Sequence, residues 1–337
     1  MGFVPTGFHH ENIAGMEVVL PNGDIVRTGQ FSKSESSVAH LTKLTFGPTI
    51  DGLFLQSNLG IVTKMGIYLT TQPQAYKACM FHMPEMDDIA VITDLFGHLR
   101  RNGTIPYLAY VFSIGEWLSF YKRREEWWDG DGPIPTWRLK EIQKELGTGF
   151  WGVRFGLYGP TRLVNAQYAE VERAAARMAP TGKLEGTMYA AEGDGSLLEA
   201  TSVDLSHGGM FVGVPSMFSL PLVNYYNRKP DSVGAHGAYS PIVPLDGKVM
   251  LEWVKAARAV YEAHGFDMCC DYFMHERYAV FVCMLPFDKT DPRQRAATDQ
   301  VFHELVEAGT KLGFAKYRTH INHMGELQDW HPWDTHS

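Results

Sequence analysis

Residues 46–70 read FGPTIDGLFLQSNLGIVTKMGIYLT, and this stretch is the strongest indication of the fold. Its glycines recur at irregular intervals among β-branched residues, which is typical of backbone that passes close to a ligand and then enters a strand. We expect that strand to continue through Thr70, and Pro73 follows it as a turn signal. The sequence therefore predicts a domain boundary here, with domains at residues 1–72 and 73–326 and a tail at 327–337.

The segment before this stretch reads as a β-hairpin. MEVVL at 16–20 and IVRTG at 25–29 flank the tetrapeptide PNGD. Asn22-Gly23 favours a tight turn in which both residues take positive φ. The chain therefore starts within a β-rich unit.

From Tyr76 onward, strand patterns alternate with amphipathic helix patterns. Asp291 and Pro292 mark one helix start, and Gly265 and Gly313 mark two helix ends. This order favours an α+β fold in which helices cover one antiparallel sheet. We expect strands at 78–83, 150–159, 266–274 and 278–285, and helices at 87–99, 135–146, 161–178, 248–264 and 291–312.

Composition excludes several classes of protein. The 337 residues are 45% hydrophobic, enough to fill two cores. The net charge of −8, without any basic run, argues against nucleic acid and anionic membranes as partners. The four cysteines lack metal-ligand or redox spacing and are interpreted as buried free thiols. No stretch is apolar enough to span a membrane and no export signal is visible, so we expect a soluble intracellular protein, cytoplasmic or peroxisomal.

Three segments, in order, resemble the vanillyl-alcohol oxidase and 4-cresol dehydrogenase family. They are GFVPTGFHHENIAGMEVVLPNGDIVRTG from Gly2, the stretch at 46–69, and YRTHINHM from Tyr317. The resemblance implies the C-terminal part of a PCMH-type FAD-binding domain followed by a cap domain that binds substrate. It also implies FAD as cofactor and oxidation of para-substituted phenols, by hydride transfer to the flavin through a quinone methide.

The resemblance assigns roles to individual residues. Tyr317 and Arg318 would hold the phenol oxygen as phenolate, which a fixed guanidinium stabilises. The alternative for Arg318 is a surface ion pair. The flavin contacts implied by the second segment are Ser57, Asn58, Gly60, Ile61 and Val62.

A fourth segment concerns attachment of the flavin. Gly234-Ala235-His236, followed by Tyr239-Ser240-Pro241, resembles the segment whose histidine bonds the flavin 8α-methyl group in oxidase members of the family. His236 would then carry FAD covalently, because a neutral imidazole is a competent nucleophile. The alternative is a solvated histidine in a glycine-rich strand.

The sequence also departs from the family. Phe3 and Phe8 stand where the family has a tyrosine and an aspartate, and the pyrophosphate loop, the catalytic aspartate and the C-terminal segment have no counterpart. We therefore expect a chain truncated at both ends, and a non-catalytic remnant with the same fold is one alternative. A flavin-dependent hydroxy-acid oxidase is another, against which the YRTH segment argues.

The implied partners are a small phenolic substrate, O2 or a cytochrome as electron acceptor, and further copies of the chain, since the family commonly forms dimers or octamers. No metal is expected. His9, His10, His320 and His323 could form a metal site only through spatial proximity.

Overall fold

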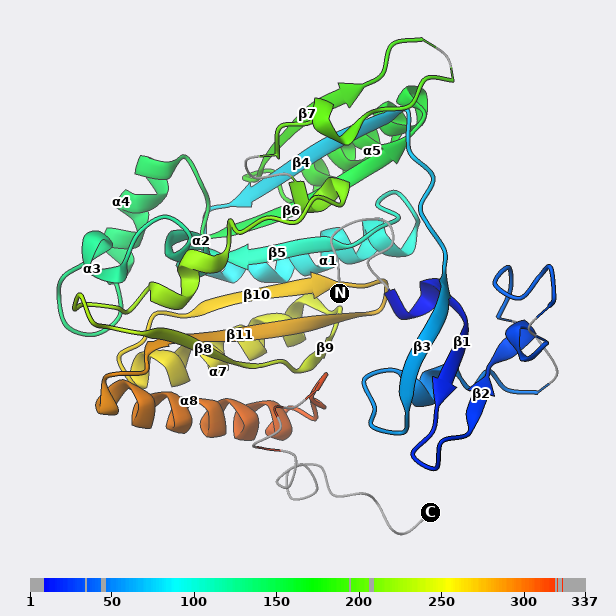
Figure 1. Ribbon diagram of the computed structural model, residues 1–337. Coiled ribbons are helices and arrows are strands. Elements are labelled where there is room, and N and C mark those ends of the chain that lie inside the picture. Colours follow the sequence, from blue (N-terminus) through cyan, green and yellow to red (C-terminus); the bar gives the residue numbers. More distant parts are fainter. Residues whose placement is uncertain are drawn as a thin grey trace. The chain divides into compact units, whose positions relative to one another are not determined.

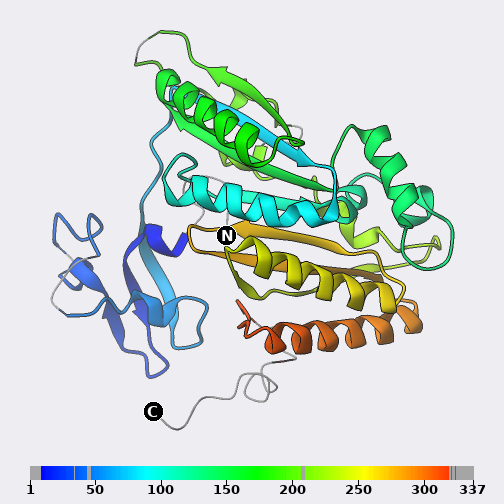
Figure 2. The ribbon, with the colours of Figure 1, turned by 180° about the vertical axis from the view of Figure 1, so that it is seen from behind.

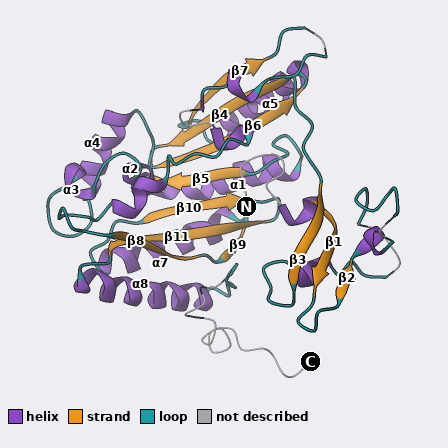
Figure 3. Ribbon diagram, in the orientation of Figure 1, coloured by secondary structure: helices purple, strands orange, loops and turns teal. Residues whose placement is uncertain are grey.

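The computed structural model describes residues 9–33, 35–43, 47–193, 195–205, 209–318, 320 and 323. The chain divides into two compact units, Met1–Gln72 and Pro73–Ser337. Each unit contains its own sheet, as the strand colouring in Figure 3 shows. Phe3, Phe8 and the tail at 327–337 lie outside the described residues.

The first unit is a three-stranded antiparallel sheet with β1 in the middle. Met16 and Val18 on β1 are fully buried, and Phe54, Leu55 and Val62 pack against them. The small core therefore lies on one side of β1. Its strands are β1 (Ile13–Val19), β2 (Ile25–Arg27) and β3 (Ile61–Ile67).

The expected hairpin joins β1 to β2, with Val19 opposite Ile25. Its turn differs from the prediction, because Gly23 has a φ of 87° whereas Asn22 does not have positive φ. The Asn22 side chain instead accepts a hydrogen bond from the Asp24 amide at 3.1 Å. Asparagine thus stabilises this turn through its side chain, and glycine alone supplies the left-handed backbone.

Gly60 has a packing role. A Cβ at this position would lie 2.5 Å from Val18 Cγ1 and 2.9 Å from the Val19 carbonyl oxygen. The absence of a side chain therefore lets the start of β3 approach β1. The sequence suggested that this glycine allows backbone to approach a cofactor, and that role stays a prediction beside the packing role that the structure shows.

The second unit is built on an eight-stranded antiparallel sheet in the order β7-β4-β6-β5-β10-β11-β8, with β9 paired to β11. β10 lies inside the sheet, between β5 and β11. Its strands are β4 (Ala75–Met83), β5 (Ala109–Ser113), β6 (Trp151–Gly159), β7 (Lys183–Ala190), β8 (Gly234–Tyr239), β9 (Ile242–Pro244), β10 (Cys269–Met274) and β11 (Tyr278–Asp288).

Helices α1, α5, α7 and α8 cover one face of this sheet, as Figures 1 and 2 show from opposite sides. The main core lies between these helices and the sheet, where Trp253 of α7 contacts Tyr239 and Phe281. The helices of the unit are α1 (Ile89–Arg101), α2 (Ile114–Ser119), α3 (Arg124–Trp127), α4 (Thr136–Leu146), α5 (Thr161–Met178), α7 (Gly247–Ala263) and α8 (Pro292–Lys311).

We call the opposite face of the sheet the far face. Side chains alternate between faces along each strand, and residues directly opposite on antiparallel neighbours share a face. Since Tyr239 and Phe281 face the helices, the strand pairings place His236, Asp271, Tyr110 and Arg154 on the far face. Residues from η6 (Gly209–Val212) contact this face, where the Tyr158 hydroxyl donates to the Phe211 carbonyl at 2.6 Å.

The sequence-based elements of the second unit are confirmed, with ends displaced by a few residues. The predicted cap of the last helix is present, because the Asp291 side chain accepts from the Arg293 amide at 2.8 Å. The helix expected to start at Asp87 starts at Ile89, after a 3-10 turn at Met86–Asp88. The α+β fold is therefore as predicted, with helices on an antiparallel sheet.

Replacing Gly60 by alanine should destabilise the first unit by about 1–3 kcal/mol, because the new methyl group overlaps Val18 and the backbone of β1. Urea unfolding followed by hydrogen exchange of β1 and β3 peptides measures this change. Gly52→Ala is the matched control, since a Cβ there meets no atom within 4 Å. Equal stabilities of the two variants would contradict the packing role of Gly60.

Candidate functional site

The expected flavin contacts lie on the turn that leads into β3. Ser57 and Asn58 are exposed, and the Ser57 hydroxyl oxygen accepts from the Leu59 amide at 3.3 Å. Gln56, just before them, has a φ of 49°, which is uncommon for a residue other than glycine. The turn therefore holds its polar side chains outward at some cost in backbone energy.

The strand after this turn exposes apolar side chains. Ile61 is 73% exposed and Ile67 is 60% exposed. An exposed apolar row next to outward hydroxyl and amide groups suits a flat aromatic cofactor with polar edges, because such ligands need both kinds of contact. The chemistry of Ser57, Asn58 and Ile61 therefore fits a flavin, whereas Val62 packs against the core of the unit.

His236 lies on β8 in the second unit, opposite Pro286 of β11. The residue is exposed overall, yet the protein around part of its ring lowers the pKa of the imidazole by desolvation. The neutral form therefore predominates at neutral pH. That is the protonation state which a nucleophilic histidine requires.

Tyr317 and Arg318 follow α8 and lie beside the end of β8. The Tyr317 amide donates to the Ser240 carbonyl at 2.8 Å, and Lys316 forms a bridge with Pro241. The Arg318 guanidinium carbon lies 5.1 Å from the centre of the Tyr317 ring, and Arg318 is exposed. The structure thus places both residues at the edge of the sheet that carries His236.

A row of residues crosses the sheet from this edge. The pairings of β11 with β8 and with β9 keep one register, which sets Ser240 opposite Val282. Val282 is opposite Asp271, and Asp271 is opposite Phe112. Because neighbouring strands are about 4.8 Å apart, Asp271 lies two strands, or about 10 Å, from Ser240.

Asp271 belongs to a buried carboxyl pair that the sequence did not reveal. Glu116 of α2 is 3% exposed and Asp271 is 6% exposed. The Tyr110 hydroxyl donates to Glu116 Oε1 at 2.6 Å. The Asp271 carboxyl lies beside the Glu116 carboxyl, so that the two groups bond when one of them is protonated. Two carboxyl groups can bond in this way only if a proton lies between them.

Burial governs the protonation of this pair. Desolvation raises the pKa of Glu116 to about 7 and raises the pKa of Asp271 well above its usual value. The proximity of Glu116 raises the pKa of Asp271 further, since two adjacent negative charges in a low dielectric repel each other. At neutral pH the pair therefore holds at least one proton and stands close to taking up a second.

Local structure explains why Glu116 reaches Asp271. Ser113 ends β5 and caps α2, accepting from the Glu116 amide at 3.3 Å. The chain folds back at once, which returns the Glu116 carboxyl to Tyr110. The sequence signal was the helix-start motif from Ser113 to Glu116 together with an acidic residue inside the apolar run of β10.

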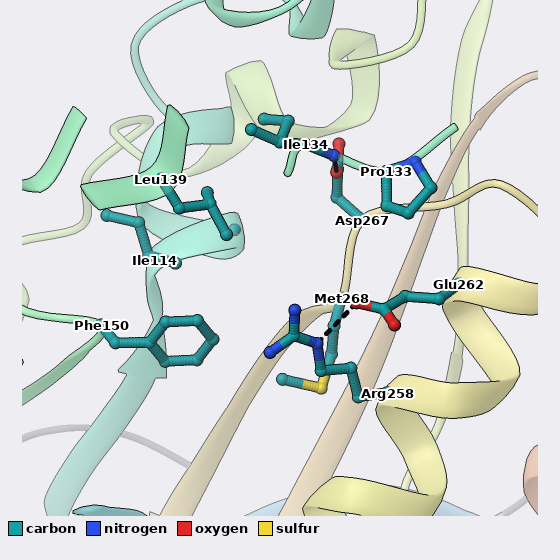
Figure 4. A pocket seen from close by; sticks show the side chains of 10 residues that line it. Ile114, Pro133, Ile134, Leu139, Phe150, Arg258, Glu262, Asp267 and Met268 are labelled. Carbon is teal, nitrogen blue, oxygen red and sulfur yellow. Dashed lines mark hydrogen bonds and ion pairs between the residues drawn. The ribbon is translucent and has the colours of Figure 1, made fainter. Parts of the chain in front are cut away.

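Another buried carboxylate, Asp267, is surrounded by hydrogen-bond donors that give it a structural role. It accepts from the Ile134 amide at 2.6 Å, from the hydroxyls of Tyr225 and Tyr226 at 3.3 Å each, and lies 3.5 Å from Arg124. Figure 4 shows it at a small pocket beside α2. These contacts use its oxygens to hold the segment after α3, so Asp267 is not a candidate for proton transfer.

Three further observations concern the cysteines, metal-binding groups and membrane-spanning helices. The four cysteines are buried and free. Within the described ranges, no three His, Cys, Asp or Glu side chains are grouped so that they could hold a metal ion. No helix in the same part of the chain combines the length and apolar composition needed to cross a membrane.

The comparison with known proteins rests on the fold of the two sheets. The fold is that of the PCMH-type FAD-binding flavoprotein oxidoreductases, and two solved structures match it over nearly the whole chain. The crystal structure of p-cresol methylhydroxylase with substrate bound has a TM-score of 0.83 and 28% identity, covering 98% of this chain and 62% of that one. The isoeugenol complex of 4-ethylphenol oxidase from Gulosibacter chungangensis has a TM-score of 0.87 and 26% identity, covering 99% and 62%.

The sequence is homologous to the same group. The flavoprotein subunit of hydroxylating 4-cresol dehydrogenase from Pseudomonas putida is 29% identical over 319 residues, which are 94% of this chain and 58% of that protein. The chain thus spans about three-fifths of the length of these relatives. No protein-family model matches it.

The free energy of unfolding should change with pH as the carboxyl pair titrates. Glu116 has a pKa of about 7 in the folded protein, against 4.5 for the ordinary group. Its protonation therefore stabilises the fold fully below pH 4.5, and this stabilisation is lost as the pH rises to 7. In the wild-type protein the free energy of unfolding should fall by about 1–3 kcal/mol over this pH range, and in Glu116→Gln it should not. Urea unfolding of the second unit measures both.

Glu170→Gln on the exposed side of α5 is the control and should keep the wild-type pH dependence. Identical slopes for wild type and Glu116→Gln would contradict the raised pKa.

Proposed function

We propose that this chain contains the substrate-binding unit and part of the flavin-binding unit of an FAD-dependent oxidoreductase. Its substrates would be para-substituted phenols of the vanillyl alcohol, 4-cresol or eugenol type. The homology to proteins named for cresol and ethylphenol supports this class. The observation that carries the proposal is the position of Tyr317 and Arg318, which lie side by side at the edge of the sheet that carries His236.

The chemistry of Tyr317 and Arg318 suits a phenol. Arg318 offers a permanent positive charge, and Tyr317 offers a hydroxyl donor, so together they favour the phenolate form. A phenolate supplies electron density to its para carbon, which assists loss of hydride from the benzylic position and leaves a quinone methide. These two residues thus bind and orient the substrate.

In the first unit, the residues proposed to contact FAD are Ser57, Asn58, Gly60, Ile61 and Val62. In the second unit, His236 is the residue proposed to bond to FAD covalently. When bound, FAD supplies the hydride acceptor for the reaction. The neutral imidazole of His236 supports the covalent bond, because its lone pair is available near neutral pH. Two electron acceptors remain, O2 and a cytochrome, and the rate of flavin reoxidation with each distinguishes them.

Arg318→Lys should weaken binding of a 4-alkylphenol at least about tenfold, because a lysine cannot reproduce the planar guanidinium beside Tyr317. The red shift of the phenolate absorbance on binding, measured with FAD present, gives the dissociation constant. Arg293→Lys on α8 is the control. Equal affinity of the Arg318 variant and wild type would exclude Arg318 as the phenolate ligand.

His236→Ala should abolish covalent flavin. The chain is incubated with FAD, precipitated in acid and examined for flavin fluorescence in the pellet. His82→Ala is a matched control, since His82 shares the far face and desolvation also lowers its pKa. Flavin released into the supernatant by the wild-type protein would remove His236 from this role.

Anaerobic addition of a 4-alkylphenol tests the activity itself. Bleaching of the flavin absorbance is the expected result. Bound FAD that stays oxidised would favour the non-catalytic alternative, and bleaching by a 2-hydroxy acid alone would favour the hydroxy-acid oxidase.

A further inference from the structure

A groove of about 660 Å³ lies between α7 and α8, which run side by side on one face of the sheet (Figure 2). Trp253 and Leu305, which these helices contribute to the main core, are fully buried. The groove is lined by other positions of the two helices, which are half-buried or exposed. It therefore opens to solvent, and no residue of the candidate functional site lines it.

The walls of the groove follow one row of side chains on each helix. The row on α7 is Glu252, Ala256 and Val260, and the row on α8 and its C-terminal cap is Glu304, Ala308 and Leu312. Each row advances by four residues per step, so its members lie along one side of the helix over about 12 Å. The alanine in the middle of each row leaves the hollow. A row of side chains from a third helix fits such a groove between two helices.

The direction of the helices sets where the charges lie. His264, just after α7, contacts Glu304 of α8 at 2.9 Å. Trp253, near the start of α7, contacts Phe314 beyond the end of α8. The two helices are therefore antiparallel, which sets Glu304 at one end of the groove and Glu252 at the other.

The rim of the groove is acidic. Three exposed glutamates, Glu252, Glu304 and Glu307, line it together with one lysine, Lys311. Two copies of this surface facing each other would set an excess of negative charge on both sides, and nucleic acid or an anionic membrane would be repelled. Charge complementarity therefore indicates an occupant with positive charge.

We propose that the groove between α7 and α8 is a docking site for a basic amphipathic helix of a partner protein. Aliphatic side chains of the partner fill the hollow over Ala256 and Ala308. Its lysines or arginines, about two helical turns apart, meet the glutamates at the two ends of the groove. One side of a helix can supply both kinds of contact, because residues three and four apart share a face. The inference is independent of the proposed oxidation of phenols.

Fluorescence anisotropy of a labelled probe peptide tests the proposal on the full chain. The probe is a designed helical peptide of about 20 residues, made of alanine with leucines along one side and lysines beside them. Wild type should bind the probe, and added salt should weaken binding, because the charges of the rim are exposed and are screened. The same peptide with glutamates in place of the lysines should not bind.

Two variants alter the groove in different ways. E252Q/E304Q/E307Q should bind the probe about tenfold more weakly, because it loses three exposed charge contacts that each change affinity by a small factor. Ala256→Leu should weaken binding by at least about tenfold, because the larger side chain occupies the hollow that the probe's leucines need.

Each of these variants has a matched control. E141Q/E145Q/E170Q removes the same charge from exposed glutamates of α4 and α5. Ala296→Leu adds the same side chain at an exposed position of α8 that does not line the groove. Both controls should bind the probe as wild type does. Equal weakening in the controls and the groove variants would overturn the inference, since binding would then be a general attraction to an acidic protein.

Hydrogen exchange locates the bound probe. Segments 252–260 and 304–312 should exchange more slowly when the probe is present, and protection confined to other segments would contradict the site. Sedimentation of the protein without the probe tests a second copy of the chain as the occupant. A wild-type dimer that Ala256→Leu dissociates would overturn the inference, and so would wild-type protein that does not bind the probe.

Discussion

The burial of β10 on both faces constrains much of the second unit. Cys269, Cys270 and Tyr272 are 0% exposed, and the strand is paired on one side to β5 and on the other to β11. The Ser113 hydroxyl fixes its start, accepting from the Cys270 amide at 3.1 Å and donating to the Met268 carbonyl at 3.3 Å. One hydroxyl group thus connects β5, α2 and β10.

This arrangement has an electrostatic consequence. A strand buried on both faces has no solvated position for an acidic side chain, so Asp271 must share a proton or find a cation. The turn at Ser113 brings Glu116 to it, and the pair shares a proton. The sheet register then sets this pair in one row with the segment that carries Tyr317. The carboxyl pair and the segment that carries Tyr317 are therefore related through backbone pairing rather than through direct contact.

The first unit, unlike the second, has a small core and several exposed apolar side chains. Its core around Met16 and Val18 is small, and β3 exposes Ile61, Met65 and Ile67. Apolar surface of this kind indicates a binding surface. Gly60 shows that the same residue can be required by the packing of the unit even where a resemblance associates it with a cofactor.

The sequence by itself determined the elements with strong periodicity and clear end signals, such as α5, which ends before Pro180, and α8, which Asp291 caps, because these signals lie within a few residues. It also showed the resemblance to the family, because each matching segment, such as YRTH or residues 46–69, is continuous in the chain. It could not locate Glu116 beside Asp271, which are brought together by strand pairing between segments far apart in the chain. Only the tertiary structure decided that contact, because the pKa of a carboxyl group depends on what burial and neighbours do to its charge, and both are properties of the folded sheet.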